Sequence, residues 1–214
     1  MNIALIGATG FVGSAILPEL LGRGHQVTVL ARNPAKLAAQ PGLSIVKADV
    51  MDAAQVAQAV AGHEAVISAY NPGWSEPQIH DLFLQGSQAI LDGVKQSSVK
   101  RLLVVGGAGS LYVAPGVQLV DTPGFPAEYK QGALAAREFL TRLQAESSLD
   151  WSFVSPPIAL APGERTGQYR LGADDLLPGQ DDQPAGISVA DLAVAIVDEI
   201  EQPRHLQRRF TVAR

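Results

Sequence analysis

Apolar and polar positions follow two alternating patterns along the first half of the chain. Continuous apolar runs of strand length recur at residues 2–6, 26–30, 43–47, 65–69 and 101–105. Segments with helical spacing separate them at residues 11–23, 34–39, 52–61 and 79–96. Because unbroken Val, Ile and Leu runs are typical of strands covered on both faces, this order predicts a parallel sheet between helical layers. We expect an α/β fold with a doubly wound parallel sheet of the Rossmann type.

The second half of the chain mixes regular periodicity with long irregular stretches. Regular elements are expected as a helix at 127–145, strands at 151–155, 167–171 and 209–213, and a last helix at 188–200. Residues 106–126 and 162–186 are rich in Gly and Pro and are expected to be loops that form a small lobe. Since no linker or repeat divides the chain, residues 1–214 predict a single domain with a small C-terminal lobe.

The first apolar run leads into three glycines at three-residue spacing, Gly7, Gly10 and Gly13. A strand, a glycine-rich turn and a helix in this order are typical of a dinucleotide pyrophosphate site. Gly7 permits the tight turn, Gly10 lets the backbone approach a phosphate, and Gly13 lets the helix pack closely on the sheet. The amides at the helix start should face the ligand at the positive end of the helix dipole. The other expected contacts in this loop are Thr9, Phe11 and Val12.

The end of the second strand indicates which dinucleotide is bound. An acidic residue there holds the ribose hydroxyls of NAD, whereas a basic residue accommodates the 2′-phosphate of NADP. Ala31 occupies the position of the acid, Arg32 and Asn33 follow, and Lys36 lies one helical turn further on. Since a guanidinium can bind a phosphate with two hydrogen bonds, these residues predict NADP(H) rather than NAD(H). The alternative is that Arg32 is a solvated loop residue.

Further cofactor contacts are expected where the later strands end, because ligands of this fold lie across the carboxyl edge of the sheet. The third strand should end near the adenine, the fourth near the pyrophosphate and ribose, and the fifth near the nicotinamide. The alternative is that these residues belong to ordinary loops. In chain order they are Asp49, Val50, Ala69, Tyr70, Asn71, Gly106 and Gly107.

Composition restricts the partners of this chain. The net charge is −5 and charged residues make up 17% of the 214 residues, whereas a nucleic-acid surface needs a basic field. The chain has no cysteine, no signal-peptide pattern, no apolar stretch near the ~20 residues of a membrane helix, and no His or carboxylate pair at metal-ligand spacing. We expect a cytoplasmic protein without nucleic-acid, membrane or metal partners. The basic cluster is expected to be a solvated edge and comprises Arg204, His205, Arg208 and Arg209.

Several stretches together carry a resemblance to a known family. They are Gly7–Gly13, Val29–Asn33, Ala48–Asp52, Val104–Ser110 and Ile187–Ala195. With them the chain resembles an atypical short-chain dehydrogenase/reductase. It is most similar to the small NAD(P)-binding group named for NADH-flavin reductases, which in turn resembles the NmrA-like regulators. The resemblance covers essentially the whole chain and implies NAD(P)-dependent oxidoreductase chemistry.

The chain departs from that family at the catalytic positions. Extended members of the superfamily carry a Ser or Thr just after the fifth strand and a later Tyr-x-x-x-Lys, in which the Tyr transfers a proton. Here the serine position falls on Ala108, with Ser110 two residues on. Tyr129 is followed directly by Lys130, and Ala133 stands where the Lys is expected. Adjacent helical residues point about 100° apart, so Lys130 cannot support Tyr129 as the usual spacing would.

Ser110, Tyr129 and Lys130 nevertheless remain candidate catalytic residues, together with His80. His80 stands at the start of the helix expected at 79–96, from which it could donate a proton to a ligand in the nicotinamide pocket. The alternative for His80 is an ordinary surface histidine.

The missing proton relay favours an acceptor that delocalises its own charge. A ketone needs a proton delivered to the developing alkoxide, whereas a flavin or quinone stacked on the nicotinamide can take its proton from solvent. A flat pocket is expected from the glycine-rich residues 106–109 and nearby aromatic side chains, namely Tyr70, Trp74, Tyr112, Phe125 and Tyr129. We therefore predict an NAD(P)H-dependent reductase of a flavin, quinone or similar small-molecule acceptor.

Two other functions stay open. NmrA-like proteins can bind the dinucleotide without turning it over, so an NADP(H)-sensing regulatory protein is the first alternative. A sugar-nucleotide epimerase or dehydratase is the second, although those enzymes usually carry a larger C-terminal lobe. A homodimer is a further option, because related folds often pair through the long helices expected at 79–96 and 127–145.

Overall fold

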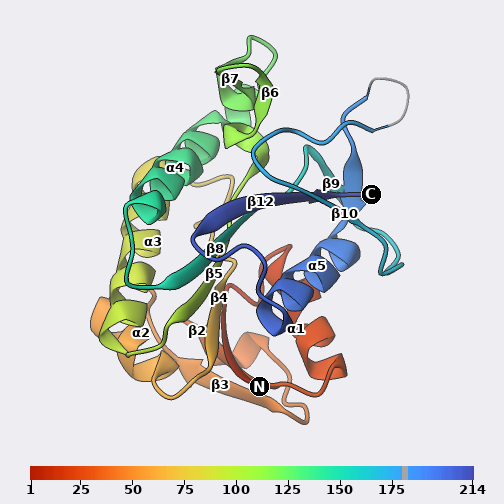
Figure 1. Ribbon diagram of the computed structural model, residues 1–214. Coiled ribbons are helices and arrows are strands. Elements are labelled where there is room, and N and C mark those ends of the chain that lie inside the picture. The colour runs from red at the N-terminus through yellow and green to blue at the C-terminus, as the bar shows by residue number, and fades with distance from the viewer. Residues whose placement is uncertain (180–182) are drawn as a thin grey trace.

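A sheet of eight strands forms the centre of the protein, with helices on both faces (Figure 1). The computed structural model describes residues 1–179 and 183–214, and of Lys36 it describes only the backbone. In spatial order the strands are β10 (Arg170–Gly172), β12 (Arg208–Ala213), β8 (Asp150–Ser155), β5 (Arg101–Val105), β4 (Ala65–Ser68), β1 (Asn2–Ile6), β2 (Gln26–Ala31) and β3 (Leu43–Lys47). All neighbours pair in parallel except β10, which runs antiparallel to β12 at one edge. The predicted Rossmann-type α/β fold is confirmed.

The helices form two layers, one on each face of the sheet (Figure 1). Their bounds are α1 (Gly13–Gly22), α2 (Ala53–Val60), α3 (Ile79–Gln96), α4 (Ala127–Gln144) and α5 (Val189–Glu201). Helices α1 and α5 pack on each other on one face, whereas α3 contacts both α2 and α4 on the other. No described helix is both long and apolar enough to cross a membrane.

Each face of the sheet has its own hydrophobic core. Phe139 of α4 packs with Trp151 and Phe153 of β8 on the side of α2, α3 and α4. On the other side Ile16 of α1 and Phe210 of β12 belong to a second cluster. These five side chains are at most 1% exposed. Side chains alternate between the two faces of a strand, so strands with apolar residues at nearly every position can supply both cores.

The sheet reverses its direction of growth at β1. This strand pairs with β2 on one side and with β4 on the other. In open α/β sheets such a reversal leaves a crevice outside the carboxyl ends of the strands, and ligands bind there. Since β1 ends at Ile6 and β4 at Ser68, the loops after these two residues border the crevice.

The predicted start of α2 is confirmed, whereas α1 starts two residues later than predicted. The Asp52 carboxylate accepts hydrogen bonds from the amides of Ala54 and Gln55 at 2.9 and 3.2 Å, so it caps α2 as expected. The first helix, expected from residue 11, begins instead at Gly13. The residues before Gly13 form a tight turn, in which the Gly10 amide donates to the Gly7 carbonyl at 2.9 Å.

Residues 106–126 contain more regular structure than the predicted loop. They form the 3₁₀ turns η2 (Ala108–Ser110) and η3 (Leu119–Asp121) and a hairpin of β6 (Tyr112–Ala114) and β7 (Val117–Gln118), which stands at the top of Figure 1. Leu111 and Val120 are fully buried beneath them. The loop prediction was wrong because strands of two or three residues are too short to show an alternating pattern.

The second segment predicted to be irregular is also partly regular. Strand β9 (Ala159–Ala161) pairs with β11 (Gly186–Ser188) in a small parallel sheet. The strand expected at 167–171 is β10 and begins three residues later, at Arg170. Residues 180–182 of this segment lie outside the described residues.

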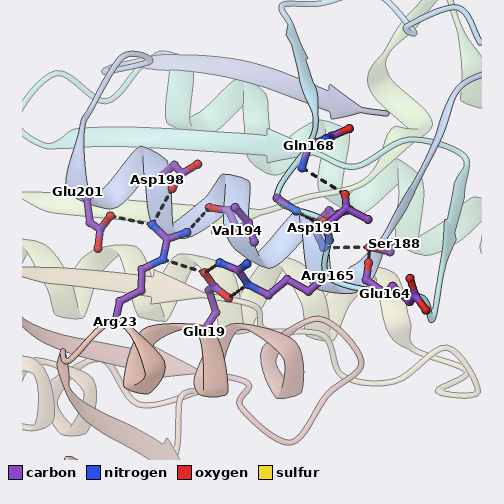
Figure 2. A network of polar contacts seen from close by, with 12 residues as sticks. Glu19, Arg23, Glu164, Arg165, Gln168, Ser188, Asp191, Val194, Asp198 and Glu201 are labelled. Carbon is purple, nitrogen blue, oxygen red and sulfur yellow. Dashed lines mark hydrogen bonds and ion pairs between the residues drawn. The ribbon is translucent and has the colours of Figure 1, made fainter.

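A network of charged groups fastens α1 to α5 and to the segment before β10 (Figure 2). Glu19 of α1, whose side chain is only 8% exposed, accepts hydrogen bonds from Arg23 at 2.7 Å and from two nitrogens of Arg165 at 2.6 and 2.8 Å. Arg23 also donates to Asp198 of α5 at 2.6 Å. Hydrogen bonding from Arg165 is the largest cause of the lowered pKa of Glu19. Burial opposes this effect, and Arg23 adds to it.

The carboxylate of Asp191, near the start of α5, binds two backbone amides and one hydroxyl of the same segment (Figure 2). Its carboxylate accepts hydrogen bonds from the amides of Thr166 and Gly167 and from the Thr166 hydroxyl, each at 2.7 Å. The Ser188 hydroxyl accepts from the Asp191 amide at 3.0 Å and caps α5, as expected from the sequence. The carboxylate of Asp191 therefore anchors a segment that is distant in the sequence.

We expect Glu19→Gln to lower the free energy of unfolding by about 2 kcal/mol at neutral pH, because charge-assisted hydrogen bonds to both arginines are lost. A lowered folded-state pKa contributes stability above the ordinary value of 4.5, and this contribution is lost as the pH falls through the folded-state value. Urea unfolding of wild type and variant at neutral pH and at successively lower values should therefore show a difference that shrinks on acidification.

Glu138→Gln is the matched control for this measurement. Glu138 pairs with Arg142 one turn away at 2.7 Å, and both side chains are at least 40% exposed. Such a pair contributes about 0.5 kcal/mol. A loss at Glu138 as large as the loss at Glu19, or a loss at Glu19 that is independent of pH, would contradict a role for Glu19 in holding the network together.

Candidate functional site

The turn after β1 is built so that two backbone segments meet without a side chain between them. Gly7 has φ +82°, and a Cβ on it would lie 2.3 Å from the carbonyl oxygen of Ala69 at the end of β4. A Cβ on Gly13 would lie 2.0 Å from the carbonyl oxygen of Gly7. Both distances are far below contact, so glycine is required at each position. The roles predicted for these two glycines agree with this geometry.

Helix α1 presents its N-terminus to the crevice. The first helical bond runs from the Ser14 amide to the Gly10 carbonyl at 2.9 Å, so the amides of residues 11–13 lie ahead of it. Such leading amides have no partner inside their own helix and carry the positive end of its dipole. Thr9, Gly10 and Phe11 are exposed beside them. This arrangement can bind a phosphate group without any charged side chain.

A cavity of about 1060 Å³ runs from this turn along the carboxyl edge of the sheet. Loops that follow β1, β2, β4, β5 and β8 line it, so it crosses the crevice from one side of β1 to the other. Most of the residues predicted to bind the cofactor lie in its wall. They are Gly7, Thr9, Gly10, Phe11, Val12, Arg32, Asn33, Val50, Ala69, Tyr70, Asn71, Gly106 and Gly107.

Other predicted cofactor residues have a different place. Gly13 packs against the backbone of Gly7 and Ala8, which form the turn. The Asp49 carboxylate accepts a hydrogen bond from the Met51 amide at 3.0 Å and so shapes the turn after β3. The side chain of Lys36 lies outside the described part of the structure.

Among the described side chains, the end of β2 contributes one cation, Arg32, to the cavity wall. Ala31 ends the strand, where an acidic residue would stand in an NAD site. Arg32 follows, exposed to solvent and part of the cavity wall. The Asn33 side chain accepts a hydrogen bond from the Ala35 amide at 3.2 Å, which fixes the turn that carries Arg32.

Tyr70 is a wall of the cavity and not an available proton donor. Its hydroxyl donates to the Leu82 carbonyl at 3.0 Å, and burial raises its pKa. Its ring packs so closely on Gly86 of α3 that a Cβ there would lie 2.5 Å from the ring. The side chain is therefore held by contacts on both its ring and its hydroxyl.

Beyond β5 the cavity is lined by glycines and rings. A Cβ on Gly106 would lie 2.0 Å from the Phe153 ring, whereas a Cβ on Gly107 would meet nothing within 4 Å. We call residues 106–109, which line the cavity, the glycine floor. Gly106 lets this floor pack on the ring of Phe153 in the core, and Gly107 leaves open space above the backbone. Trp74 and Tyr129 line the same cavity and form an edge-to-face pair with ring centroids 5.2 Å apart.

The sequence prediction named most of this aromatic wall but not all of it. Trp74, Phe125 and Tyr129 line the cavity as expected, whereas Tyr112 lines a different cavity. The segment Pro156–Ile158 after β8 is a further part of the wall that was not predicted. Two consecutive prolines directly after a strand could have indicated it, because they stiffen a loop at the carboxyl edge of the sheet.

Ser110, His80 and Lys130, the other catalytic candidates, are not among the residues that line this cavity. Ser110 and His80 line a second cavity of about 580 Å³ between α4 and the β6–β7 hairpin. Ser110 is buried, and its hydroxyl accepts a hydrogen bond from Arg209 at 3.0 Å. His80 bonds to the neighbouring carboxylate of Asp81 at 3.0 Å. Lys130 is exposed on α4 beside Tyr129.

Arg209 corrects the expectation that the C-terminal basic cluster is a solvated edge. It is buried, and its guanidinium donates to the Ser110 carbonyl at 2.7 Å and to the Asp174 carboxylate at 2.6 and 2.8 Å. It thus ties η2, which continues the glycine floor of the large cavity, to the segment after β10. Sequence could not reveal this role because the contacts span 35 to 99 residues.

The chain belongs to the family described as NAD(P)H-binding, whose model it matches over residues 7–203. A protein from Burkholderia pseudomallei provisionally described as exported is 46% identical, with a TM-score of 0.90 and full coverage of both chains. A provisionally named epimerase from Bacteroides thetaiotaomicron is 44% identical, with a TM-score of 0.92, and covers 99% of this chain and 96% of its own. A provisionally named NADH-flavin reductase from Streptococcus pneumoniae TIGR4, SP1627, is 35% identical, with a TM-score of 0.87, over 100% and 99% of the two chains.

These similarities confirm the predicted membership of the atypical short-chain dehydrogenase/reductase group. Membership of this family indicates that the chain has a binding site for a nicotinamide dinucleotide. The large cavity fits this cofactor, because it combines the helix N-terminus at Gly10 with a crevice that extends past β4 to the glycine floor at Gly107.

We expect Gly10→Glu to weaken the binding of both NADPH and NADH by at least about 100-fold, which corresponds to roughly 3 kcal/mol. A carboxylate at this position would stand between the leading amides of α1 and the pyrophosphate and repel it. Calorimetric titration with each nucleotide measures the effect. Gly22→Glu is the matched control, because Gly22 is exposed at the other end of α1 and a Cβ there meets nothing within 4 Å. Wild-type affinity in the Gly10 variant would contradict this site assignment.

Proposed function

We propose that the protein is an NAD(P)H-dependent reductase that passes a hydride to a flavin, quinone or similar conjugated acceptor. The observation that carries the proposal is the composition of the cavity wall, in which the glycine backbone at Gly107 and the aromatic pair of Trp74 and Tyr129 line one cavity. Ser110 faces the second cavity, and the Tyr70 hydroxyl is bound to the Leu82 carbonyl. The name of the Streptococcus pneumoniae relative supports the same class of reaction.

The wall residues explain what such a site would do. When bound, the reduced cofactor supplies a hydride, and the acceptor leaves with that hydride and one proton while the cofactor leaves oxidised. Trp74 and Tyr129 orient a flat ring over the glycine floor, and Pro156–Ile158 exclude water from one side. A reduced flavin or quinone spreads its negative charge over its rings, so the proton can come from solvent.

Tyr129→Phe tests whether Tyr129 acts as a wall or as a proton donor. If it is a wall, the variant should keep kcat/KM within about threefold, because the ring and its contact with Trp74 remain. A ketone reductase that used the hydroxyl would lose about 100-fold or more. Oxidation of NADPH followed at the nicotinamide absorbance, with riboflavin and menadione as acceptors, measures this. A 100-fold loss of kcat in the phenylalanine variant would argue for hydroxyl-dependent chemistry and against the proposal.

We further propose that NADPH is preferred over NADH. Arg32 is the cation in the cavity wall at the end of β2, and Ala31 leaves no carboxylate there to repel a 2′-phosphate. We expect Arg32→Ala to weaken NADPH binding by about 10- to 100-fold and NADH binding much less. Arg208→Ala, at an exposed arginine of β12, is the control for lost charge alone. An equal loss for both nucleotides would mean that Arg32 does not bind the 2′-phosphate.

A dinucleotide sensor that does not turn its ligand over is the second candidate, and the separation of Ser110 from the large cavity favours it as well. Calorimetric titration followed by NADPH oxidation assays separates the two functions. Tight binding with acceptor-dependent oxidation supports the reductase, whereas tight binding without oxidation of any acceptor supports the sensor.

A further inference from the structure

The two ends of the large cavity differ in charge. Among its described lining residues Arg32 is the one charged side chain, and it lies at the end of β2. Strands β1 and β4 separate β2 from β5, so Arg32 is remote from the glycine floor at Gly107. The aromatic pair in the wall carries two polar groups, the Tyr129 hydroxyl and the Trp74 indole nitrogen. A ligand beside this pair would meet hydrogen-bonding groups but no cation among the described lining residues.

The charges on α4 beside Tyr129 are of both signs. On α4 the exposed Glu128 and Lys130 flank Tyr129 with opposite charges. Two uncharged residues of the wall are largely open to solvent, with Trp74 54% and Ile158 48% exposed. The whole chain carries a net charge of −5, and a bound dinucleotide adds its phosphates. The surroundings therefore disfavour an anionic group on the acceptor.

The aromatic pair at this end is held in position by the helix beneath it. A Cβ on Gly132 of α4 would lie 2.7 Å from the Trp74 ring, so the indole rests directly on the helix backbone. Tyr129, one turn earlier, meets the same ring edge-to-face. Trp74 and Tyr129 are nevertheless each more than 40% exposed to solvent, which leaves area on their rings for another flat ring to cover.

We infer that the acceptor site selects uncharged planar ring systems and discriminates against acceptors that carry a phosphate. This inference rests on the proposed function and narrows its substrate class to neutral flavins and quinones. A neutral ring gains by covering Trp74 and Tyr129, whereas a phosphate there would lose hydration without a cation in the described wall near these rings, and Glu128 offsets the charge of Lys130 outside it.

Riboflavin and FMN test the inference directly, because they share one ring system and differ by a phosphate. At saturating NADPH we expect kcat/KM for riboflavin to exceed that for FMN by about 10-fold, and added salt to narrow the difference by screening the repulsion. Menadione, an uncharged quinone, should be reduced as well. Equal kcat/KM for the two flavins would overturn the inference and leave the reductase function intact.

A binding measurement decides the inference independently of turnover. Quenching of flavin fluorescence, titrated with NADP⁺-saturated protein, gives the affinity for each flavin. If no acceptor is reduced, the proposed function fails. In that case tighter binding of riboflavin than of FMN still supports selection by charge, and equal binding overturns it.

Ile158→Lys adds a cation to the described cavity wall, in which Arg32 is the one charged side chain. We expect it to raise kcat/KM for FMN relative to riboflavin at least fivefold, whereas Ile158→Met, of similar size and without charge, should affect the two flavins alike. Trp74→Ala should lower the affinity for both flavins by about 10-fold through lost stacking. An unchanged FMN-to-riboflavin ratio in the lysine variant would contradict the electrostatic basis of the selection.

Discussion

The backbones of β1, α1 and β4 approach so closely at Gly7 and Gly13 that no side chain fits between them. A Cβ on Gly13 would lie 2.0 Å from the Gly7 carbonyl oxygen, and one on Gly7 would lie 2.3 Å from the Ala69 carbonyl oxygen. This contact places the first amides of α1 at the carboxyl edge of the sheet, where the order of strands reverses. The position of the cavity and the direction of its anion-binding end both follow from it.

Three aromatic rings in or beneath the cavity wall pack in the same way on glycines. Tyr70 rests on Gly86, Phe153 on Gly106 and Trp74 on Gly132, and in each case a Cβ on the glycine would lie within 2.7 Å of the ring. Each ring is therefore positioned by a helix or loop that has no side chain at the contact. Because a closely packed ring cannot shift without losing contact area, these contacts make the wall rigid.

Sequence reasoning succeeded where the signal is local and failed where it depends on distant packing. The turn at Gly7, the cap at Asp52 and the start of α5 at Ser188 each depend on residues within a few positions, and each agrees with the structure. Ser110 is three residues beyond Gly107, which lines the large cavity, yet the turn of η2 directs it to Arg209, which is 99 residues away in the chain.

The sequence by itself determined that the fold has a doubly wound parallel sheet, that a glycine turn follows the first strand and that Arg32 provides a cation after the second. Hydrophobic periodicity, backbone freedom and charge predict these three features in turn, and all three are properties of short segments. Only the tertiary structure decided which side chains share the cavity with that turn. It buried Arg209 against Asp174, assigned Ser110 to a second cavity and brought Trp74 onto α4. These outcomes depend on how helices and loops pack across the sheet, and no local pattern in the chain encodes such contacts.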